Sequence, residues 1–274
     1  MPLPANPMVR RLIGTVFAAW LVASVIALLL GQSVAVVAPA ALGLLLVLAS
    51  ILAASAFNEH RRLQDYRQME AYVSLVAALQ PVHPLPTMRH WAASPDVLKE
   101  IAELVLEGSP KLVVEASSGT STVIIALCLR KLGNGGRVLA LEHDAVFAER
   151  TRRALRAQGL SDIATVTHAP LKPYLIGTTT YHWYDLDELT LDVPINLLVV
   201  DGPPGSVQRM ARYPAVPLLV DQLAPDAVVV VDDGARSDER RMVQEWTQSH
   251  AMQAEYLHLD KGAYVLRRLP KGGS

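Results

Sequence analysis

The sequence predicts an α/β domain with a mainly parallel central sheet, preceded by a hairpin of two apolar helices. Two uncharged apolar runs stand near the N-terminus, and beyond residue 85 short apolar runs alternate with amphipathic segments. The 274 residues allow one ordinary α/β domain of about 200 residues plus a smaller part. Hydrophobic residues make up 51% of the chain, and the N-terminal runs hold much of the excess.

The N-terminal runs predict a transmembrane hairpin with spans at residues 12–30 and 34–57. Each run is uncharged and long enough to cross about 30 Å of hydrocarbon as a helix. A cleaved signal peptide is the alternative for the first run, but another full-length apolar segment follows it at once. The arginines lie outside both spans, which places both flanks in the cytoplasm; they are Arg10, Arg11, Arg61, Arg62 and Arg67. We therefore expect a multi-pass protein of the plasma (inner) membrane, with both termini and the large domain cytoplasmic.

Composition divides the chain into a hairpin over residues 1–57, a linker helix over 58–84 and a domain over 85–274. Prolines at positions 81, 84 and 86 end the linker helix.

The domain reads as alternating strands and helices. Strands are predicted at 111–116, 137–142, 164–169, 195–200, 227–233 and 262–268. Helices are predicted at 95–108, 121–132, 146–158, 213–223 and 237–249, the first with Ser94 as N-cap. This order implies a parallel sheet covered on both faces.

Polar residues whose side chains could bind a ligand or transfer a proton lie at or near the ends of these strands. They are Glu115, Glu142, His168, Asp201, Asp232 and Asp233. Ligands of open parallel sheets bind outside the carboxyl ends of the strands, so this edge is the expected site.

Composition excludes several classes of partner and site. The formal net charge of −1 provides no basic field for a nucleic-acid backbone. The single cysteine, Cys128, can form neither an internal disulfide nor a multi-cysteine zinc site, and its apolar neighbours indicate a buried side chain.

The turn EASSGTST at 115–122 leads into a helix whose N-terminal N–H groups can hold an anion. It matches neither the dinucleotide GxGxxG pattern nor a P-loop. Together with LALEHD, LLVVDGPPG and VVVVDDG in this order, it resembles class I S-adenosylmethionine-dependent methyltransferases over roughly residues 85–268. The resemblance implies a Rossmann-like methyltransferase domain.

The resemblance also implies a cofactor site. Its residues would be Glu115, Ser117, Gly119, Ser121, Glu142, His143, His168, Ala169 and Asp201. Gly119 would allow close backbone approach, Ser121 would lie near the cofactor carboxylate, and Glu142 would accept hydrogen bonds from both ribose hydroxyls. The family usually has glycine where Ser117 stands, and a β-carbon there narrows the space.

Asp201, Asp232 and Asp233 match the positions at which metal-dependent O-methyltransferases hold magnesium. Three carboxylates suit an octahedral oxygen shell, and the alternative is that they only order their turns. Pro204 stands where the catechol-type enzymes have a lysine base. Asp201, His182 and His90 remain candidates for the general base.

Two segments are candidates for contacts with the acceptor. In the long connection 173–193, Tyr181, Trp183 and Tyr184 either stack on a sugar and cover the site or anchor their own loop. Arg209 and Arg212 follow Asp201 and either bind a phosphate or carboxylate or stay solvated.

The favoured hypothesis is a membrane-anchored O-methyltransferase acting at the cytoplasmic face on a glycan or lipid-linked envelope precursor. S-adenosylmethionine is the expected cofactor, with magnesium as a second ligand, and a homo-oligomer is compatible with the sequence. A catalytically silent module that assembles a membrane complex is the alternative, favoured by Ser117 and the missing lysine. Aminopropyl transfer on the same fold is a third hypothesis.

Overall fold

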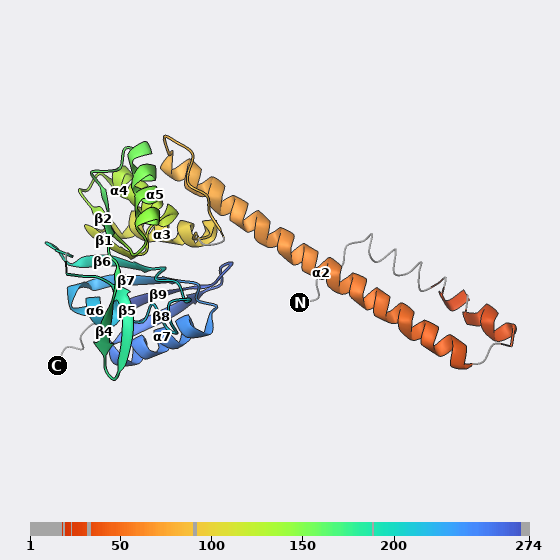
Figure 1. Cartoon of the computed structure of the whole chain (residues 1–274). Helices are drawn as coiled ribbons and strands as arrows, with labels where there is room; N and C mark the ends of the chain where they lie inside the picture. Colours follow the sequence, from red (N-terminus) through yellow and green to blue (C-terminus); the bar gives the residue numbers. More distant parts are fainter. Residues whose placement is uncertain are drawn as a thin grey trace. The chain divides into compact units, whose positions relative to one another are not determined.

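The computed structural model describes residues 18, 20–22, 24–31, 34–89, 92–187 and 189–269 (Figure 1). Arg10, Arg11, His90, the trailing KGGS and part of the first predicted span lie outside the described residues. The chain divides into two compact units, residues 1–66 and 67–274, and each is described by itself.

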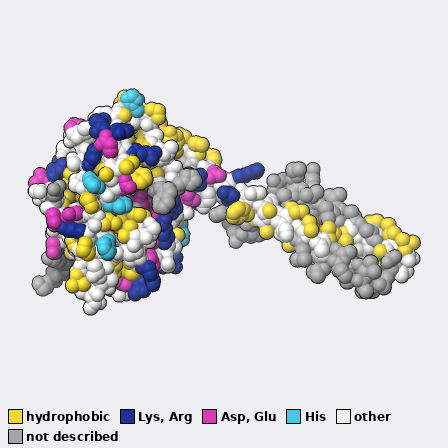
Figure 2. Space-filling model, viewed as in Figure 1, with side chains coloured by type: hydrophobic (Ala, Val, Ile, Leu, Met, Phe, Trp, Pro, Cys, Tyr) yellow, Lys and Arg dark blue, Asp and Glu magenta, His cyan; other side chains and the backbone are white. Residues whose placement is uncertain are grey.

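The described part of the N-terminal unit is helical and largely apolar. A short apolar helix covers Trp20–Leu29, and helix α2 (Val34–Leu79) runs through the second predicted span and most of the predicted linker. Among the described helices, one is long and apolar enough to cross a membrane, at Gly43–Leu79. Large apolar side chains such as Leu28, Leu45 and Phe57 are exposed along this unit (Figure 2). The predicted two-helix hairpin is therefore described only in part.

The last turns of α2 belong to the C-terminal unit. Ala71, Leu75 and Leu79 are buried, and the latter two join a hydrophobic core. The side-chain oxygen of Gln68 accepts a hydrogen bond from the Asp96 N–H at 3.2 Å. The helix ends before Gln80, whose φ of 46° leads the chain into the proline-rich segment.

A seven-stranded sheet forms the centre of the C-terminal unit, in the order β3-β2-β1-β6-β7-β9-β8. Five neighbouring strands run parallel: β3 (Ala164–His168), β2 (Arg137–Glu142), β1 (Leu112–Ala116), β6 (Ile195–Val200) and β7 (Leu223–Asp232). Strand β9 (Ala263–Arg268) is antiparallel to β7, and β8 (Met252–Leu257) is antiparallel to β9. The predicted mainly parallel sheet is confirmed.

Two layers cover the sheet (Figure 1). One contains α3 (Pro95–Gly108), α4 (Thr120–Leu132) and α5 (Ala145–Ala157). The other contains α6 (Ala215–Leu219), α7 (Ser237–Ser249) and a hairpin of β4 (Leu171–Ile176) and β5 (Thr179–Tyr184). Alternate side chains enter the two layers, as Val113 and Val114 of β1 do, because successive residues of a strand face opposite sides.

Three predictions about secondary structure need correction. The predicted helix 213–223 is only α6 plus a 3-10 turn at Val220–Gln222, and Leu223 already begins β7. Pro214 and Pro217 remove helix-forming N–H groups from this short segment. The predicted long connection 173–193 contains most of the β4–β5 hairpin, and β8 was not predicted.

Candidate functional site

The strand ends that the sequence singled out lie along one edge of the sheet. His168 is the register partner of Glu142, and the N–H of Asp201 donates to the Ala116 carbonyl at 3.2 Å. Val200 and Val231, which precede Asp201 and Asp232, are also register partners. The parallel register therefore brings the predicted residues of five strands to one edge.

The turn after β1 is organised by a buried carboxylate. Glu115 is fully buried, and its two oxygens accept hydrogen bonds from the Ser121 hydroxyl and, at 2.6 Å, from the Thr122 hydroxyl. Burial raises the pKa of Glu115 to about 7, although both hydroxyl groups oppose the shift. The Ser121 hydroxyl, which was expected near a cofactor carboxylate, contacts Glu115.

Close backbone approach occurs around Ser117 and Gly202. Ser117 has a φ of 143°, a value that favours glycine. A β-carbon on Gly202 would lie 2.3 Å from the Tyr184 hydroxyl and 3.2 Å from the Ser117 β-carbon. A β-carbon on Gly119 would meet no atom within 4 Å, so the chain beside Gly119 borders open space.

Glu142 forms the second part of the site, and it is 4% exposed. One oxygen accepts from the Asp144 N–H at 3.0 Å and lies 3.1 Å from His143 Nδ1, while the other accepts from the Ser118 hydroxyl at 3.1 Å. The Ala169 N–H donates to the Glu142 carbonyl at 2.7 Å. The carboxylate is therefore held in one orientation at the end of β2, next to the exposed His168.

Tyr184 is part of the site. The sequence predicted that it either covers the site or anchors its own loop. Its side chain is 1% exposed, and its ring packs edge to face with His143 at 6.0 Å between centroids. Burial raises the pKa of Tyr184 well above its usual range, and the charges of Glu142 and Asp201 add to the shift. Trp183 is also buried, so these aromatics anchor the hairpin and do not form an exposed sugar platform.

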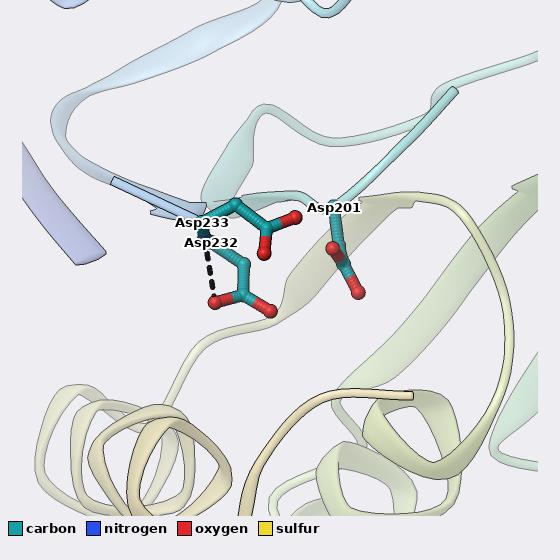
Figure 3. Close-up of side chains that lie close together, drawn as sticks. All are labelled: Asp201, Asp232 and Asp233. Atoms are coloured by element: carbon teal, nitrogen blue, oxygen red, sulfur yellow. Dashed lines mark hydrogen bonds between the residues drawn. The ribbon is translucent and has the colours of Figure 1, made fainter. Parts of the chain in front are cut away.

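Asp201, Asp232 and Asp233 come together as predicted (Figure 3). One oxygen from each carboxylate lies within 4.8 Å of the others, and the Asp233 N–H donates to Asp232 Oδ1 at 2.7 Å. Asp232 Oδ2 is buried without a hydrogen-bond partner among the described residues. Burial and mutual repulsion raise the pKa of Asp201 strongly and that of Asp232 to about 6.

Arg212 lies inside this acidic centre, which sequence reasoning did not foresee. It is 4% exposed, and its Nη2 donates to Asp201 Oδ1 at 3.2 Å and to Asp233 Oδ2 at 2.7 Å. Its Nη1 donates to the Asp232 backbone carbonyl at 2.9 Å. Arg212 is thus neither solvated nor free to bind a substrate phosphate.

The acidic centre fits magnesium in ligand type, but arginine side chains already contact two of its three carboxylates. Arg236 Nη1 lies 2.9 Å from Asp233 Oδ2, so two guanidinium groups contact the carboxylates of Asp201 and Asp233. The Glu239 carboxylate lies 3.7 Å from both guanidinium groups and forms ion pairs with them. The Arg212 guanidinium already bridges two of the predicted metal ligands, Asp201 and Asp233.

The other predicted catalytic and acceptor-binding residues lie apart from these contacts. His182 is exposed on β5, and its backbone N–H donates to the Gln208 side chain at 3.0 Å. Arg209 is 80% exposed and lies 3.8 Å from Asp238. Of the three candidate bases, Asp201 is the one that the described structure places in the acidic centre.

A hollow of about 350 Å³ lies beside the acidic centre. Its lining residues are Gly205, Met210, Ala211, Arg236, Ser237, Asp238 and Glu239. Arg236 and Glu239 connect it to the acidic centre through their contacts with Asp233 and Arg212.

Comparison with known proteins finds a family similarity over part of the chain. Residues 116–234 match a family model described as a methyltransferase domain, which covers the turn after β1, Glu142 and the acidic centre. This part of the chain is therefore similar to methyltransferase domains. No curated protein matches the sequence.

Solved structures share the fold at low sequence identity. A methyltransferase from Podospora anserina, solved with SAH, has 13% identity and a TM-score of 0.56, covering 77% of this chain and 96% of its own. A putative O-methyltransferase from Klebsiella pneumoniae has 19% identity and a TM-score of 0.51, covering 76% and 96%. The cofactor-bound Rv0187 from MTB has 22% identity and a TM-score of 0.50, covering 74% and 91%. These likenesses establish the Rossmann-like α/β methyltransferase fold.

Proposed function

We propose that this chain is a membrane-anchored, S-adenosylmethionine-dependent O-methyltransferase. The observation that carries the proposal is the edge of the sheet itself. It holds an oriented carboxylate at Glu142 and an acidic centre at Asp201, within the part of the chain that matches a methyltransferase domain.

S-adenosylmethionine would lie along this edge and supply an electrophilic methyl group. Each Glu142 oxygen accepts one hydrogen bond, from the Asp144 N–H or the Ser118 hydroxyl, and so keeps acceptor capacity for a ribose hydroxyl. Gly119 borders open space for the cofactor, and His143, His168 and Ala169 border the adenine side. Ser117 and Tyr184 narrow the space between the ends of β1 and β6.

Asp201 is the proposed acceptor of the proton from the attacking hydroxyl. The new bond joins the acceptor oxygen to the methyl carbon, the sulfur–methyl bond breaks, and the proton moves to the Asp201 carboxylate. Burial raises the pKa of Asp201, which makes its carboxylate a stronger base than an exposed aspartate. The neighbouring hollow is the proposed place of the acceptor.

The membrane anchor motivates the acceptor class, a glycan or lipid-linked envelope precursor at the cytoplasmic face. Support comes from the exposed apolar side chains of the N-terminal unit and from the length of the apolar part of α2. Arg61, Arg62 and Arg67 follow the span and favour a cytoplasmic domain. The two-helix hairpin and the plasma-membrane location are part of this proposal.

Methyl transfer can be tested with the full-length protein in detergent, labelled S-adenosylmethionine and extracts of the cell envelope. We expect labelled material that partitions with lipid-linked glycans, and little label with Asp201→Asn. Label in the soluble fraction alone would refute the proposed acceptor class, whereas no transfer by a protein that binds the cofactor would favour the silent assembly module.

Topology can be tested separately with Ser33→Cys and Ser161→Cys in intact cells. Cys128 is buried and burial raises the pKa of its thiol to about 12, so the background reaction is low. A membrane-impermeant maleimide should label the cysteine at position 33 only. Labelling at position 161 would contradict a cytoplasmic domain.

A magnesium ion held by Asp201, Asp232 and Asp233 is the alternative organisation of this site. The unpartnered Asp232 Oδ2 favours it, because a buried carboxylate oxygen requires a donor or a cation.

A further inference from the structure

Arg212 connects the ends of the two strands that carry the acidic centre. It follows β6 in sequence and contacts Asp201 at the end of β6 and both the Asp232 carbonyl and Asp233 at the end of β7. The predicted metal ion would bridge the same strand ends. The guanidinium group therefore holds the bridging position that a metal ion has in a three-aspartate site.

We infer that Arg212 is the resident cation of this centre, so that methyl transfer proceeds without a divalent metal ion and Arg212 positions Asp201 for proton transfer. The inference rests on the proposed function for the identity of the reaction. Its basis is the set of hydrogen bonds that Arg212 donates, and its first measurable consequence, weak metal binding, does not depend on turnover.

The guanidinium group cannot readily make room for a metal ion. An arginine side chain keeps its charge at every pH that the protein tolerates. Arg212 is 4% exposed, and three hydrogen bonds fix its two terminal nitrogens. A metal ion on the remaining oxygens of the three aspartates would lie beside this fixed positive charge.

Neighbouring charges support the same arrangement. Arg236 contacts Asp233 from the side of α7, and Glu239 of α7 lies near both guanidinium groups. Arg236 is 52% exposed, whereas Arg212 is buried. Solvent screens the ion pair of Arg236 more strongly, so Arg236 interacts with the aspartates more weakly than Arg212 does. Replacing Arg236 thus serves as a matched control that removes a guanidinium but leaves the bridge.

Arg212 also determines which carboxylate oxygen of Asp201 is left without a hydrogen bond and could accept a proton from the methyl acceptor. It occupies Asp201 Oδ1, while Oδ2 accepts no hydrogen bond from the residues that the structure describes. The Asp201 side chain as a whole is 15% exposed. Arg212 is therefore a positioning residue, since it acts on the substrate through Asp201.

The test measures Mn²⁺ binding by electron paramagnetic resonance on the full-length protein in detergent, for wild type, Arg212→Gln, Arg212→Lys and Arg236→Gln. We expect no binding to wild type or Arg236→Gln at millimolar Mn²⁺. Arg212→Gln should bind at least about tenfold more tightly than wild type, because the bridging charge is gone. Wild-type binding at micromolar Mn²⁺ would overturn the inference, even if Arg212→Gln does not fold.

Activity and cofactor binding complete the test. Wild-type transfer should survive chelation by EDTA, and loss of transfer that added Mg²⁺ restores would also overturn the inference. Arg212→Gln should lower kcat by about 100-fold with little change in cofactor affinity. Arg212→Lys should have a kcat between those of Arg212→Gln and wild type. Failure of wild type to bind S-adenosylmethionine would instead refute the proposed function, and the metal titration would still decide the role of Arg212.

Discussion

Glu115→Gln should remove a pH-dependent loss of stability. Glu115 is fully buried at the end of β1, and its pKa rises from 4.5 to about 7 because burial disfavours the charged form. A folded-state pKa above the unfolded value means that the native state holds the proton more tightly. The stabilisation is complete below about pH 4.5 and is lost as the pH rises to about 7.

The shift is about 2.5 pKa units, which corresponds to about 3 kcal/mol of unfolding free energy. Wild type should lose about this amount between about pH 5 and about pH 8 relative to Glu115→Gln. Urea unfolding of the full-length protein in detergent, followed by fluorescence of the buried Trp183 and Trp246, gives the free energies. Glu103→Gln, at an exposed position of α3, is the matched control.

Gln also alters the hydrogen bonds to Ser121 and Thr122. The quantity to compare is therefore the change in unfolding free energy between the two pH values, for wild type and for Glu115→Gln. An equal loss of stability for Glu115→Gln at both pH values would refute the reasoning. It would mean that the two hydroxyl groups stabilise the charged carboxylate enough to offset its burial.

Five further substitutions, at four positions, test the packing of the site. Gly202→Ala should destabilise the protein by about 2 kcal/mol, and adding Tyr184→Phe should recover part of this in urea unfolding, because the clashing hydroxyl is removed. Ser117→Gly should raise stability by about 1 kcal/mol through relief of the strained φ of 143°, and calorimetry should show tighter cofactor binding; unchanged values would indicate no strain. Trp183→Phe should cost less than about 1.5 kcal/mol, because the indole N–H is buried without a partner among the described residues, whereas Trp183→Ala should cost about 4 kcal/mol by unfolding.

Much of the fold follows from the sequence because the central strands are strongly patterned. Strands β1, β6 and β7 contain apolar runs with Glu115, Asp201 and Asp232 at or next to their ends, and such runs are typical of strands buried on both faces. Once these strands are taken as parallel, their acidic ends must lie at one edge. The structure brings Asp201, Asp232 and Asp233 together at this edge.

The β4–β5 hairpin and β8 escaped prediction for physical reasons. Strand β4 contains Pro173, which cannot donate to a ladder, and its turn depends on Gly177 at a φ of 60°. Strand β8 pairs with β9 at the margin of the sheet, and its residues other than Met252 are half-buried or exposed. Weak patterning of this kind does not distinguish a strand from a loop.

Arg212 and Tyr184 show the limit of reasoning from sequence about a site. Arg212 stands in a loop rich in small residues and prolines, where an arginine is usually solvated, and only the fold of residues 202–214 brings it to Asp201. Tyr184 reaches Gly202 only because the hairpin packs against the sheet. Both contacts depend on tertiary structure that no local pattern encodes.

The central claim is that the edge of the sheet binds S-adenosylmethionine through Glu142. Calorimetric titration of the full-length protein in detergent tests it most directly, with Glu142→Ala as the variant and Glu103→Ala as the exposed control. We predict binding by wild type and by Glu103→Ala, and an affinity lower by about 100-fold for Glu142→Ala, since two charge-assisted hydrogen bonds of about 1.5 kcal/mol each are lost. No binding to folded wild type, or equal binding by all three proteins, would contradict the account.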